Sequence, residues 1–327
     1  MTWLAGDIGG TKSHLALIVK NGGEFVIARE KKFPSQDYLD LHVLIKEFLQ
    51  EQSGNISKAC FGIAGPIKEG VSQITNLPWL ISSKELKKTF CIEQVALIND
   101  LEANAYGLSL LQKKDLCSVN EGASHSKGNQ AIISPGTGLG EAGLFFNGKH
   151  HLPFACEGGH TDFAPQSDDE DLLLRFLRQK YNNHISYERV LSGPGLCAIY
   201  QFIVHEGKEK ENPSLFREIF SGNASQTISE MGMKGLSKAC ERALNLFVSI
   251  LGAEAGNLAL KIFATGGIFL GGGISPKILK KIKSEIFLSS FTKKGRFAKL
   301  LRDIPIWVVL NDKASLFGAI YYATRVM

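Results

Sequence analysis

Two glycine-rich segments, each lying between apolar runs and each followed by an Asn-Gly pair, constrain the fold of this chain most. The first is Gly6-Asp7-Ile8-Gly9-Gly10-Thr11, and the second is Pro135-Gly136-Thr137-Gly138-Leu139-Gly140. Thr11 lies ten positions before Asn21-Gly22, and Thr137 lies ten positions before Asn147-Gly148. Asn-Gly between apolar runs favours the tight turns of β-hairpins. The matching spacing predicts two related lobes, each opening with a hairpin whose glycine loop faces phosphate.

Alternating apolar and amphipathic stretches predict an α/β fold. Residues 59–64 and 95–98 are apolar runs typical of buried strands, and residues 39–50 carry apolar side chains at the spacing of an amphipathic helix. Strands that alternate with helices favour a largely parallel central sheet. Later elements are predicted as a helix at 235–263, a strand at 266–274, a helix starting at Ser275-Pro276, a strand at 305–310 and a helix at 314–323.

The length of the chain favours two domains with a cleft between them. We expect a boundary near Leu110, which gives a smaller α/β lobe over residues 1–110 and a larger lobe over residues 111–304. The terminal segment, about residues 305–327, is expected to return to the first lobe.

Composition excludes several classes of protein. The 37 Lys and Arg residues barely exceed the 32 Asp and Glu residues and are spread along the chain, which argues against a nucleic-acid partner. The densest basic stretch, residues 277–302, is interpreted as a solvated face rather than an anion site. The six cysteines lie far apart, without the spacing of a zinc or redox motif. The sequence shows neither a leader nor an apolar run of about 20 residues, so we expect a cytoplasmic protein without a membrane span.

The glycines of the first segment allow backbone N–H groups to approach phosphate oxygens. Thr11 adds a hydroxyl donor, whereas Asp7 would repel a phosphate directly and better suits a hydrated Mg²⁺ that bridges to it. The segment lacks the lysine of a P-loop and the spacing of a dinucleotide fingerprint. The alternative is a tight hairpin with Asp7 capping a loop amide. The second segment weighs against it, and a third cluster around Gly272 is available for the base and ribose of a nucleotide.

Asn99-Asp100 follows the apolar run at 95–98, where a strand is expected to end and a helix to begin. Ligands of open α/β sheets collect at the carboxyl ends of strands. A carboxylate in that place can accept the proton of a sugar hydroxyl as it attacks a γ-phosphoryl group. The alternative role of Asp100 is the N-cap of the following helix, and the two roles are compatible.

Two further segments offer groups that could recognise an acceptor. Glu157-Gly158-Gly159-His160 places an acid and an imidazole on a bend, and together these groups can accept from and donate to hydroxyls. The alternative is a surface turn with an exposed histidine. Glu188 precedes a Gly-Pro break and a helix; taken by itself it better fits a surface ion pair with Arg189 or Lys180.

Taken together, these segments resemble the bacterial glucokinases of the non-zinc group, within the superfamily of hexokinases, actin and heat-shock ATPases. The matching segments run in order over most of the chain and are Gly6–Thr11, Gly62-Ile63-Ala64-Gly65-Pro66, Thr75-Asn76-Leu77-Pro78-Trp79, Ile98-Asn99-Asp100, Gly136–Gly140, Glu157–His160 with Asp162-Phe163-Ala164-Pro165, and Glu188–Gly195.

The resemblance implies a two-lobed actin-like (ribonuclease H-like) ATPase fold. It further implies a transferase that phosphorylates glucose to glucose 6-phosphate in the first step of glycolysis, with ATP and Mg²⁺, usually as a homodimer. On this analogy Asp100 is the catalytic base, and Asp7 is the acid associated with the metal. The sugar-binding residues implied are Asn99, Asp100, Glu157, His160 and Glu188, and the ATP-binding residues are Gly6, Asp7, Ile8, Gly9, Gly10, Thr11, Gly136, Thr137, Gly138 and Gly272.

Two positions depart from the family pattern. Lys12 stands where the glucokinase group usually has Asn, and Pro135 stands where the wider superfamily often has Asp. The alternatives to glucose phosphorylation are a kinase of another hexose or of an N-acetylated sugar, a non-catalytic sugar sensor, and an ATPase or phosphotransfer to an acid. A regulator would normally need a DNA-reading element such as an N-terminal helix-turn-helix. The first strand is expected to begin by Leu4, so we expect no such element before it.

Overall fold

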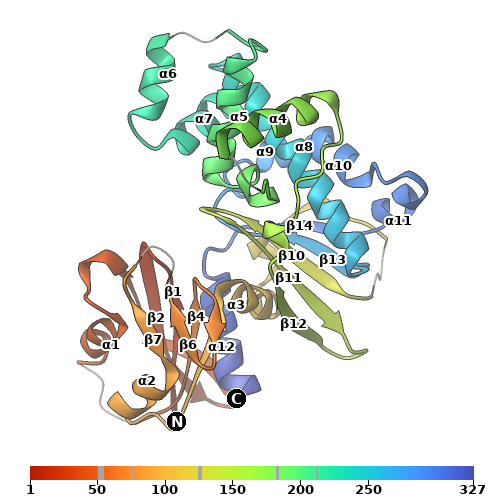
Figure 1. The fold of residues 1–327 in the computed structure, drawn as a ribbon. Coiled ribbons are helices and arrows are strands. Elements are labelled where there is room, and N and C mark those ends of the chain that lie inside the picture. The colour runs from red at the N-terminus through yellow and green to blue at the C-terminus, as the bar shows by residue number, and fades with distance from the viewer. Residues whose placement is uncertain (51–54, 75–76, 124–126, 182–183, 211–212) are drawn as a thin grey trace. The chain divides into compact units, whose positions relative to one another are not determined.

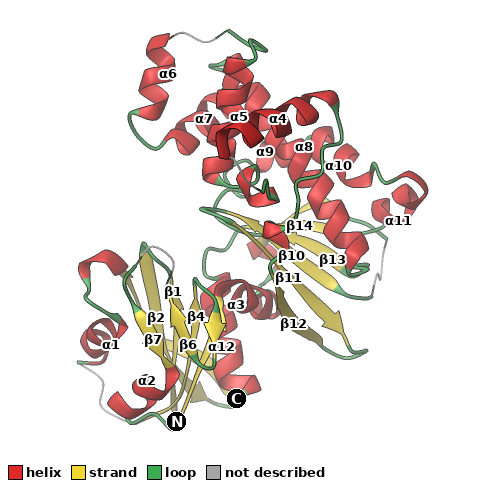
Figure 2. Cartoon of the chain, in the orientation of Figure 1, coloured by secondary structure: helices red, strands yellow, loops and turns green. Residues whose placement is uncertain are grey.

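The computed structural model describes residues 1–50, 55–74, 77–123, 127–181, 184–210 and 213–327 (Figure 1). These residues form two compact units. Unit 1 comprises Met1–Gln112, Pro153–Ala155 and Asn311–Met327, and unit 2 comprises Lys113–Leu152 and Cys156–Leu310. Both units combine strands with helices, which confirms the predicted α/β class (Figure 2). Thr75 and Asn76, which carry part of the family resemblance, lie outside the described residues.

The elements of unit 1 alternate strands with short helices. They are β1 (Thr2–Ile8), β2 (Lys12–Asn21), β3 (Glu24–Pro34), α1 (Leu41–Leu49), β4 (Ile56–Ile63), β5 (Ile67–Lys68), β6 (Val71–Gln73), β7 (Leu80–Ser82), α2 (Ser83–Thr89), β8 (Gln94–Asn99), α3 (Asp100–Gly107) and α12 (Ala314–Tyr321).

The main sheet of unit 1 has the order β3-β2-β1-β4-β8. β1 runs antiparallel to β2 and parallel to β4, and β4 runs parallel to β8. Successive side chains of a strand point to opposite faces. Leu4 accordingly packs in the cluster with α1 and α2, while Trp3 and Ala5 pack in the cluster with α3 and α12. The sheet is therefore covered by helices on both faces.

The terminal helix α12 packs closely against α3 in unit 1. Glycines make this approach possible: a Cβ atom on Gly318 would collide with the carbonyl oxygen of Ala103, and one on Gly107 would collide with that of Ala314. The chain thus ends on the unit in which it began. The returning segment is shorter than the range 305–327, because residues up to Leu310 belong to unit 2.

Unit 2 contains a second sheet and most of the helices. Its elements are β9 (Leu116–Asn120), β10 (Gln130–Pro135), β11 (Leu139–Phe146), β12 (His151–Cys156), α4 (Asp168–Tyr181), α5 (Gly193–His205), α6 (Pro213–Phe220), α7 (Ala224–Lys234), α8 (Lys238–Lys261), β13 (Gly267–Leu270), α9 (Leu279–Ile282), α10 (Glu285–Thr292), α11 (Ala298–Arg302) and β14 (Ile306–Val309).

The second sheet has the order β12-β11-β10-β13-β14-β9 and repeats the plan of the first. Its strands belong to unit 2 except for Pro153–Ala155 of β12, which are counted with unit 1. β10 runs antiparallel to β11 and parallel to β13, as β1 does to β2 and β4. The second Asn-Gly pair also makes the predicted turn, since the Asn147 side chain accepts hydrogen bonds from the N–H groups of Lys149 and His150. The internal repeat predicted from the two glycine segments is confirmed.

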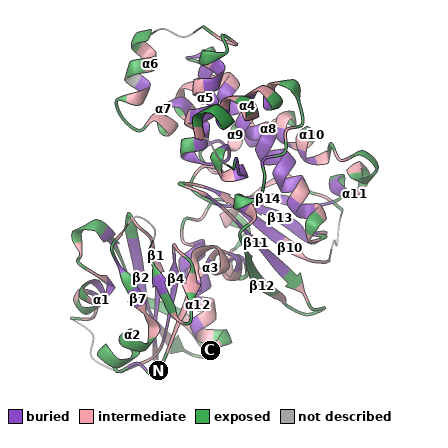
Figure 3. Cartoon of the chain, in the orientation of Figure 1, coloured by how far each residue is buried: buried purple, intermediate pink, exposed green. Residues whose placement is uncertain are grey.

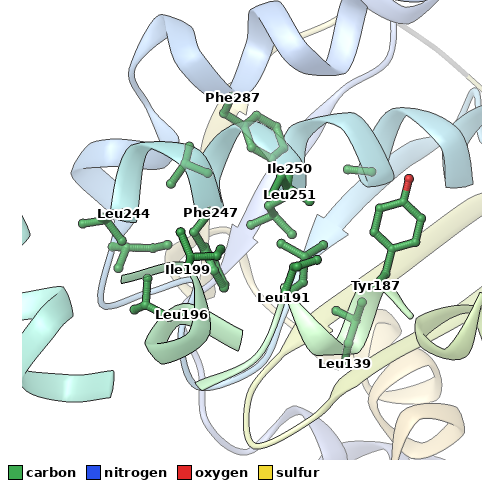
Figure 4. Packing of buried hydrophobic residues seen from close by; sticks show 14 of the residues in the cluster. Leu139, Tyr187, Leu191, Leu196, Ile199, Leu244, Phe247, Ile250, Leu251 and Phe287 are labelled. Carbon is green, nitrogen blue, oxygen red and sulfur yellow. The ribbon is translucent and has the colours of Figure 1, made fainter. Parts of the chain in front are cut away.

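Helix α8 is the centre of the hydrophobic core of unit 2. It contacts α5, α7 and α10, and nearly all of its apolar side chains are buried (Figure 3). Among the described residues it is the one helix long and apolar enough to cross a membrane, but 72% of its most apolar window is buried, as in the core helix of a folded domain. Figure 4 shows that Leu139 and Tyr187 pack in the same cluster as Phe247 and Leu251 of α8.

One predicted helix start is wrong. Helix α9 begins at Leu279, with Ile278 as its N-cap, rather than at Ser275-Pro276. The chain between β13 and α9 instead forms consecutive turns, in which the N–H of Ile274 donates to the carbonyl of Pro135 at 3.2 Å. This bond ties the segment to the end of β10 and keeps it out of the helix.

Candidate active site

The first glycine segment divides between a strand and a loop. Gly6, Asp7 and Ile8 belong to β1, and Gly9, Gly10 and Thr11 connect β1 to β2. A Cβ atom on Gly6 would lie 2.7 Å from side-chain atoms of both Leu15 and Phe61, so packing within the unit requires this glycine. In the loop that follows, the N–H of Gly9 donates to the carbonyl of Lys12 at 3.0 Å, so the backbone N–H groups that can face a phosphate are those of Gly10 and Thr11.

Ser35, which the sequence analysis did not single out, holds this loop in place. It is fully buried, its hydroxyl donates to the carbonyl of Gly9 at 2.7 Å, and its N–H donates to the carbonyl of Thr11 at 3.0 Å. The Ser13 hydroxyl lies 2.9 Å from that of Ser35. A serine in a polar stretch gives no sequence signal of such a role.

Asp7 lies on β1 beneath the same loop. Its Oδ1 atom accepts a hydrogen bond from the Ser315 hydroxyl of α12 at 2.8 Å. The observed donor is therefore this hydroxyl and not a loop amide, as the alternative interpretation had it. Burial raises the pKa of the Asp7 carboxyl, while this hydrogen bond lowers it and the charge of Asp312 raises it further. Asp312 is itself paired with Lys32 at 2.8 Å.

The donor set around Asp7 fits a hydrated magnesium ion. A cation beside the carboxyl would favour its charged form, which burial otherwise disfavours. Mg²⁺ is commonly held by one or two carboxylates together with water and substrate phosphates, rather than by a cage of protein groups. The described residues contain no group of three or more His, Cys, Asp or Glu side chains that could hold a metal.

Asn99 and Asp100 stand at the junction of β8 and α3. Asn99 is the N-cap of α3, and its Oδ1 atom accepts from the N–H of Leu101 at 2.9 Å. Asp100 is the first residue of the helix, and its own Oδ1 atom also lies 3.0 Å from that N–H. The capping role considered for Asp100 is thus taken by Asn99. Asp100 lies in the first turn of α3, where the partial positive charge of a helix N-terminus favours an acidic side chain.

The loop and the acid lie at one edge of the same sheet. The parallel strands β1, β4 and β8 place Ile8, Ile63 and Asn99 in register at their carboxyl ends. Gly9 follows the first of these residues and Asp100 follows the last. Because neighbouring strands are about 4.8 Å apart, the two are separated by roughly 10 Å, the scale of a phosphate group and an attacking hydroxyl between them.

The second glycine segment forms the tight turn between β10 and β11 in unit 2, where the N–H of Gly136 donates to the carbonyl of Gly138 at 2.8 Å. Gly272 abuts this turn: its φ is +73°, and a Cβ atom there would collide with the Pro135 carbonyl. Two predicted nucleotide-binding clusters thus lie side by side. Thr137, between the turn glycines, is exposed.

Glu157 and His160 flank a short turn, the Glu157–His160 turn, whose Gly158–His160 portion is a single 3₁₀ turn. Both side chains are exposed. The glycines between them are required by close packing, since a Cβ atom on Gly158 would collide with the carboxylate of Glu141 and one on Gly159 with the carbonyl of Leu139. The turn is therefore set directly on β11.

Glu188 links this region to the second glycine turn. Its Oε2 atom accepts from the N–H of Leu139 at 3.0 Å, and a Cβ atom on Gly138 would collide with the same oxygen. The candidate ion-pair partners are engaged elsewhere: Arg189 lies over the ring of Tyr181, and Lys180 donates to Gln201. Glu188 thus has a specific place in the site.

The candidate sugar-binding residues are divided between the units. Asn99 and Asp100 belong to unit 1, and Glu157, His160 and Glu188 belong to unit 2. Sequence reasoning missed Ser35, Ser315 and Glu141. A signal was available for Glu141, because it is an acid within the otherwise apolar run of β11.

A family model described as Glucokinase matches residues 4–326 of the chain. A glucokinase of Nostoc sp. is 39% identical over 337 residues, which cover 98% of this chain and 98% of that protein. A glucokinase of Shigella dysenteriae is 36% identical over 318 residues, which cover 97% of this chain and 95% of that protein.

Solved structures show the same likeness. The crystal structure of a glucokinase from an Antarctic psychrotroph superposes with a TM-score of 0.83 at 32% identity and 98% coverage of both chains. A ROK-family glucokinase of Streptomyces griseus, solved with glucose and AMPPNP, superposes with a TM-score of 0.64 at 18% identity and 99% coverage of both chains, which is a likeness of fold. The predicted two-lobed actin-like ATPase fold is confirmed.

Proposed function

The chain belongs to the glucokinase family, and we propose that Asp100 is the general base with which it phosphorylates glucose. As a glucokinase it is an enzyme that transfers the γ-phosphoryl group of ATP to glucose and forms glucose 6-phosphate. The observation that carries the proposal is the shared sheet edge, where Asp100 follows β8 and the Gly9–Thr11 loop follows β1.

The chemistry follows from this placement. The Asp100 carboxylate accepts the proton of the glucose 6-hydroxyl as its oxygen attacks the γ-phosphorus, and the bond to the leaving ADP oxygen breaks. Phosphoryl transfer relies mainly on positioning and on charge stabilisation, and a positioned base contributes about 10²- to 10⁴-fold in rate. The hydrogen bond that Asn99 makes as helix cap fixes the start of α3 and therefore the backbone that carries Asp100.

The sugar is held by carboxylate, amide and imidazole groups. Glu157 and Glu188 accept from glucose hydroxyls, and Asn99 and His160 can both donate and accept. Glu188 retains Oε1 for the sugar while Oε2 accepts from Leu139. A site whose polar groups expect hydroxyl partners rejects a sugar that leaves them unpaired, so this set determines which hexose is preferred.

The nucleotide is bound by backbone groups of both glycine segments. The N–H groups of Gly10 and Thr11 in the first segment and of Thr137 and Gly138 in the second bind phosphate oxygens, and Gly272 leaves room for the nucleoside. We assign Asp7, with Ser315 behind it, to the hydrated Mg²⁺ that accompanies ATP. When bound, this ion neutralises charge on the phosphate oxygens.

The predicted lobes, residues 1–110 with the returning terminus and residues 111–304, are proposed as the two lobes that contribute to these sites. We further propose a cytoplasmic homodimer that acts in the first step of glycolysis, as the family resemblance implies.

A panel of hexoses tests this function. Formation of glucose 6-phosphate from ATP and Mg²⁺ is measured with glucose, mannose, fructose and N-acetylglucosamine, and ATP hydrolysis is measured without sugar. The highest kcat/KM is expected with glucose, with little hydrolysis in its absence. ATP turnover that is independent of sugar, or a preference for the N-acetylated sugar, would contradict the assignment.

A further inference from the structure

Glu141 occupies an unusual place for a carboxylic acid. It lies on β11, is 1% exposed, and reaches beneath the Glu157–His160 turn, where its Oε2 atom fills the space that a side chain on Gly158 would need. The backbone of that turn therefore rests on the Glu141 carboxyl. Neither the phosphate chemistry nor the sugar contacts proposed above use this residue.

A second buried acid takes the hydrogen-bond donors of this region. Glu254 of α8 is 0% exposed and accepts from Lys261 Nζ at 3.1 Å and from Asn257 Nδ2 at 2.7 Å. By contrast, Glu141 Oε1 is buried without a hydrogen-bond partner among the described residues. The hydrogen-bond donors stabilise a charge on Glu254, and Glu141 lacks such stabilisation. Of the two acids, Glu141 is therefore the one that holds a proton.

The charges that face Glu141 support this assignment. Burial raises the pKa of its carboxyl to about 8, the charge of Glu254 adds to the rise, and Lys261 opposes it. From β12, Cys156 presents a thiol that donates to the Glu141 carbonyl at 3.3 Å, and burial raises the pKa of that thiol. Near pH 7 Glu141 is thus neutral and the thiol is protonated.

The hydrogen bonds of Asn257 also extend to Tyr187, the residue before Glu188. Asn257 Nδ2 also donates to the Tyr187 hydroxyl at 3.0 Å, and Lys294 Nζ donates to Asn257 Oδ1 at 2.6 Å. Tyr187 directly precedes Glu188, and its N–H donates to the carbonyl of Thr161, next to His160, at 3.0 Å. The buried acids therefore underlie both segments that carry the sugar-binding groups of unit 2.

We propose that Glu141 is a positioning residue for glucose: its uncharged carboxyl supports the Glu157–His160 turn, and its ionised form displaces that turn. The inference rests on the proposed function, because Glu157 and His160 are the groups assigned to the sugar. The Oε1 atom of Glu141 has no hydrogen-bond donor among the described residues. An ionised Glu141 is in addition repelled by Glu254 and must seek water. Gly158 lies directly against the Glu141 carboxylate, so a movement of this carboxylate toward water displaces the Glu157–His160 turn.

This gives a specific alkaline dependence. Glucose binds the form with neutral Glu141, and the apparent KM for glucose rises as that form is depleted. With a pKa of about 8 for Glu141, the neutral fraction falls to roughly one tenth near pH 9. The KM for glucose is expected to rise about tenfold between about pH 7 and pH 9, with a smaller change in the KM for ATP.

The test is the pH profile of the glucose KM in the wild-type enzyme and in Glu141→Gln, the isostere of the neutral form. The variant is expected to keep a low KM at pH 7 and to lose the alkaline rise. Glu170→Gln is the matched control, because Glu170 is a third buried acid and burial raises its pKa, but its carboxylate accepts from the N–H of Gln166 rather than lying beneath the turn. It should retain the rise.

Glu254→Gln gives an independent reading if Glu141→Gln folds poorly. Removing the like charge lowers the pKa of Glu141, so the rise in KM should begin at lower pH. The proposal is overturned if Glu141→Gln and the wild-type enzyme share one profile, or if neither shows a rise. His160→Ala at pH 7 distinguishes the proposed function from the proposal about Glu141. An unchanged KM for glucose in this variant would refute the assignment of His160 to the sugar, whatever the result for Glu141.

Discussion

The carboxylate of Glu188 accepts a hydrogen bond from the backbone N–H of Leu139 at 3.0 Å. Leu139 directly follows the Gly136–Gly138 turn, and Glu188 is one of the residues assigned to the sugar. The N–H of Gly193 also donates to the carbonyl of Gly136 at 2.9 Å. Within unit 2, a residue proposed to bind the sugar is therefore joined by a hydrogen bond to the end of a turn proposed to bind the nucleotide.

Glu188→Ala should accordingly impair both substrates. Loss of a hydrogen bond to a charged group costs about 1.5–3 kcal/mol, so the KM for glucose and the KM for ATP are each expected to rise about tenfold or more. Steady-state kinetics with each substrate varied in turn measures this. Arg189→Ala is the control, since Arg189 lies over Tyr181. A rise in the glucose KM alone would mean that the Leu139 bond does not position the turn.

Ser315→Ala should weaken the binding of MgATP. The Ser315 hydroxyl is the donor that the structure gives to Asp7 Oδ1, and without it the carboxylate loses its orientation. A loss of about 1.4 kcal/mol corresponds to a tenfold rise in the KM for MgATP, with the KM for glucose little changed. Ser57→Ala, which removes a hydroxyl bonded to the Thr2 carbonyl near the start of β1, is the control. Equal effects of the two substitutions would contradict the role of Ser315.

Gly272→Ala should reduce both stability and nucleotide affinity. Its φ of +73° is unfavourable for any other residue, and the added Cβ would meet the Pro135 carbonyl. Such strain costs roughly 1–3 kcal/mol. Gly273→Ala is a matched control, because a Cβ atom there meets nothing within 4 Å. Thermal unfolding and the KM for ATP report the two effects, and identical behaviour of the two variants would refute the packing argument.

The stability of the enzyme should depend on pH through Glu141. Its folded pKa of about 8 lies above the ordinary value of 4.5, so the folded state holds a proton that the unfolded state has lost. This contribution is complete below about pH 4.5, declines as pH rises, and is lost above about pH 8, with a slope of at most about 1.4 kcal/mol per pH unit. As the pH rises from about 4.5 to about 8, the melting temperature of Glu141→Gln should therefore increase relative to that of the wild-type enzyme. Parallel curves would show that Glu141 is ionised throughout.

The sequence predicted those features that depend on local pattern. The Asn-Gly turns and glycine segments indicated two equivalent hairpins, and the strand order of the two sheets confirms that repeat. The apolar run before Asn99 indicated a strand that ends next to the acid Asp100, and β8 does end at Asn99. These features follow from spacing within short stretches, which a single sequence displays directly.

The remainder depends on partners that are distant in the chain. Ser315 meets Asp7 across 308 positions, and Ser35 reaches back to the loop that begins at Gly9. The role of Gly6 was interpreted as phosphate binding, whereas its packing against Leu15 and Phe61 is visible only in the folded unit. The helix predicted at Ser275-Pro276 failed because a bond to Pro135, also distant in sequence, holds the chain in turns.

The most direct test of the central claim is the rate of glucose 6-phosphate formation by Asp100→Asn. The amide is isosteric with the carboxylate and retains an acceptor for the N–H of Leu101, which lies 3.0 Å from Asp100 Oδ1. The fold and the affinity for glucose should therefore be preserved, as calorimetric titration can verify. If Asp100 is the base, kcat falls about 10²- to 10⁴-fold. A kcat that stays within about threefold of wild type would contradict the account, since so small a change is under 1 kcal/mol in the barrier.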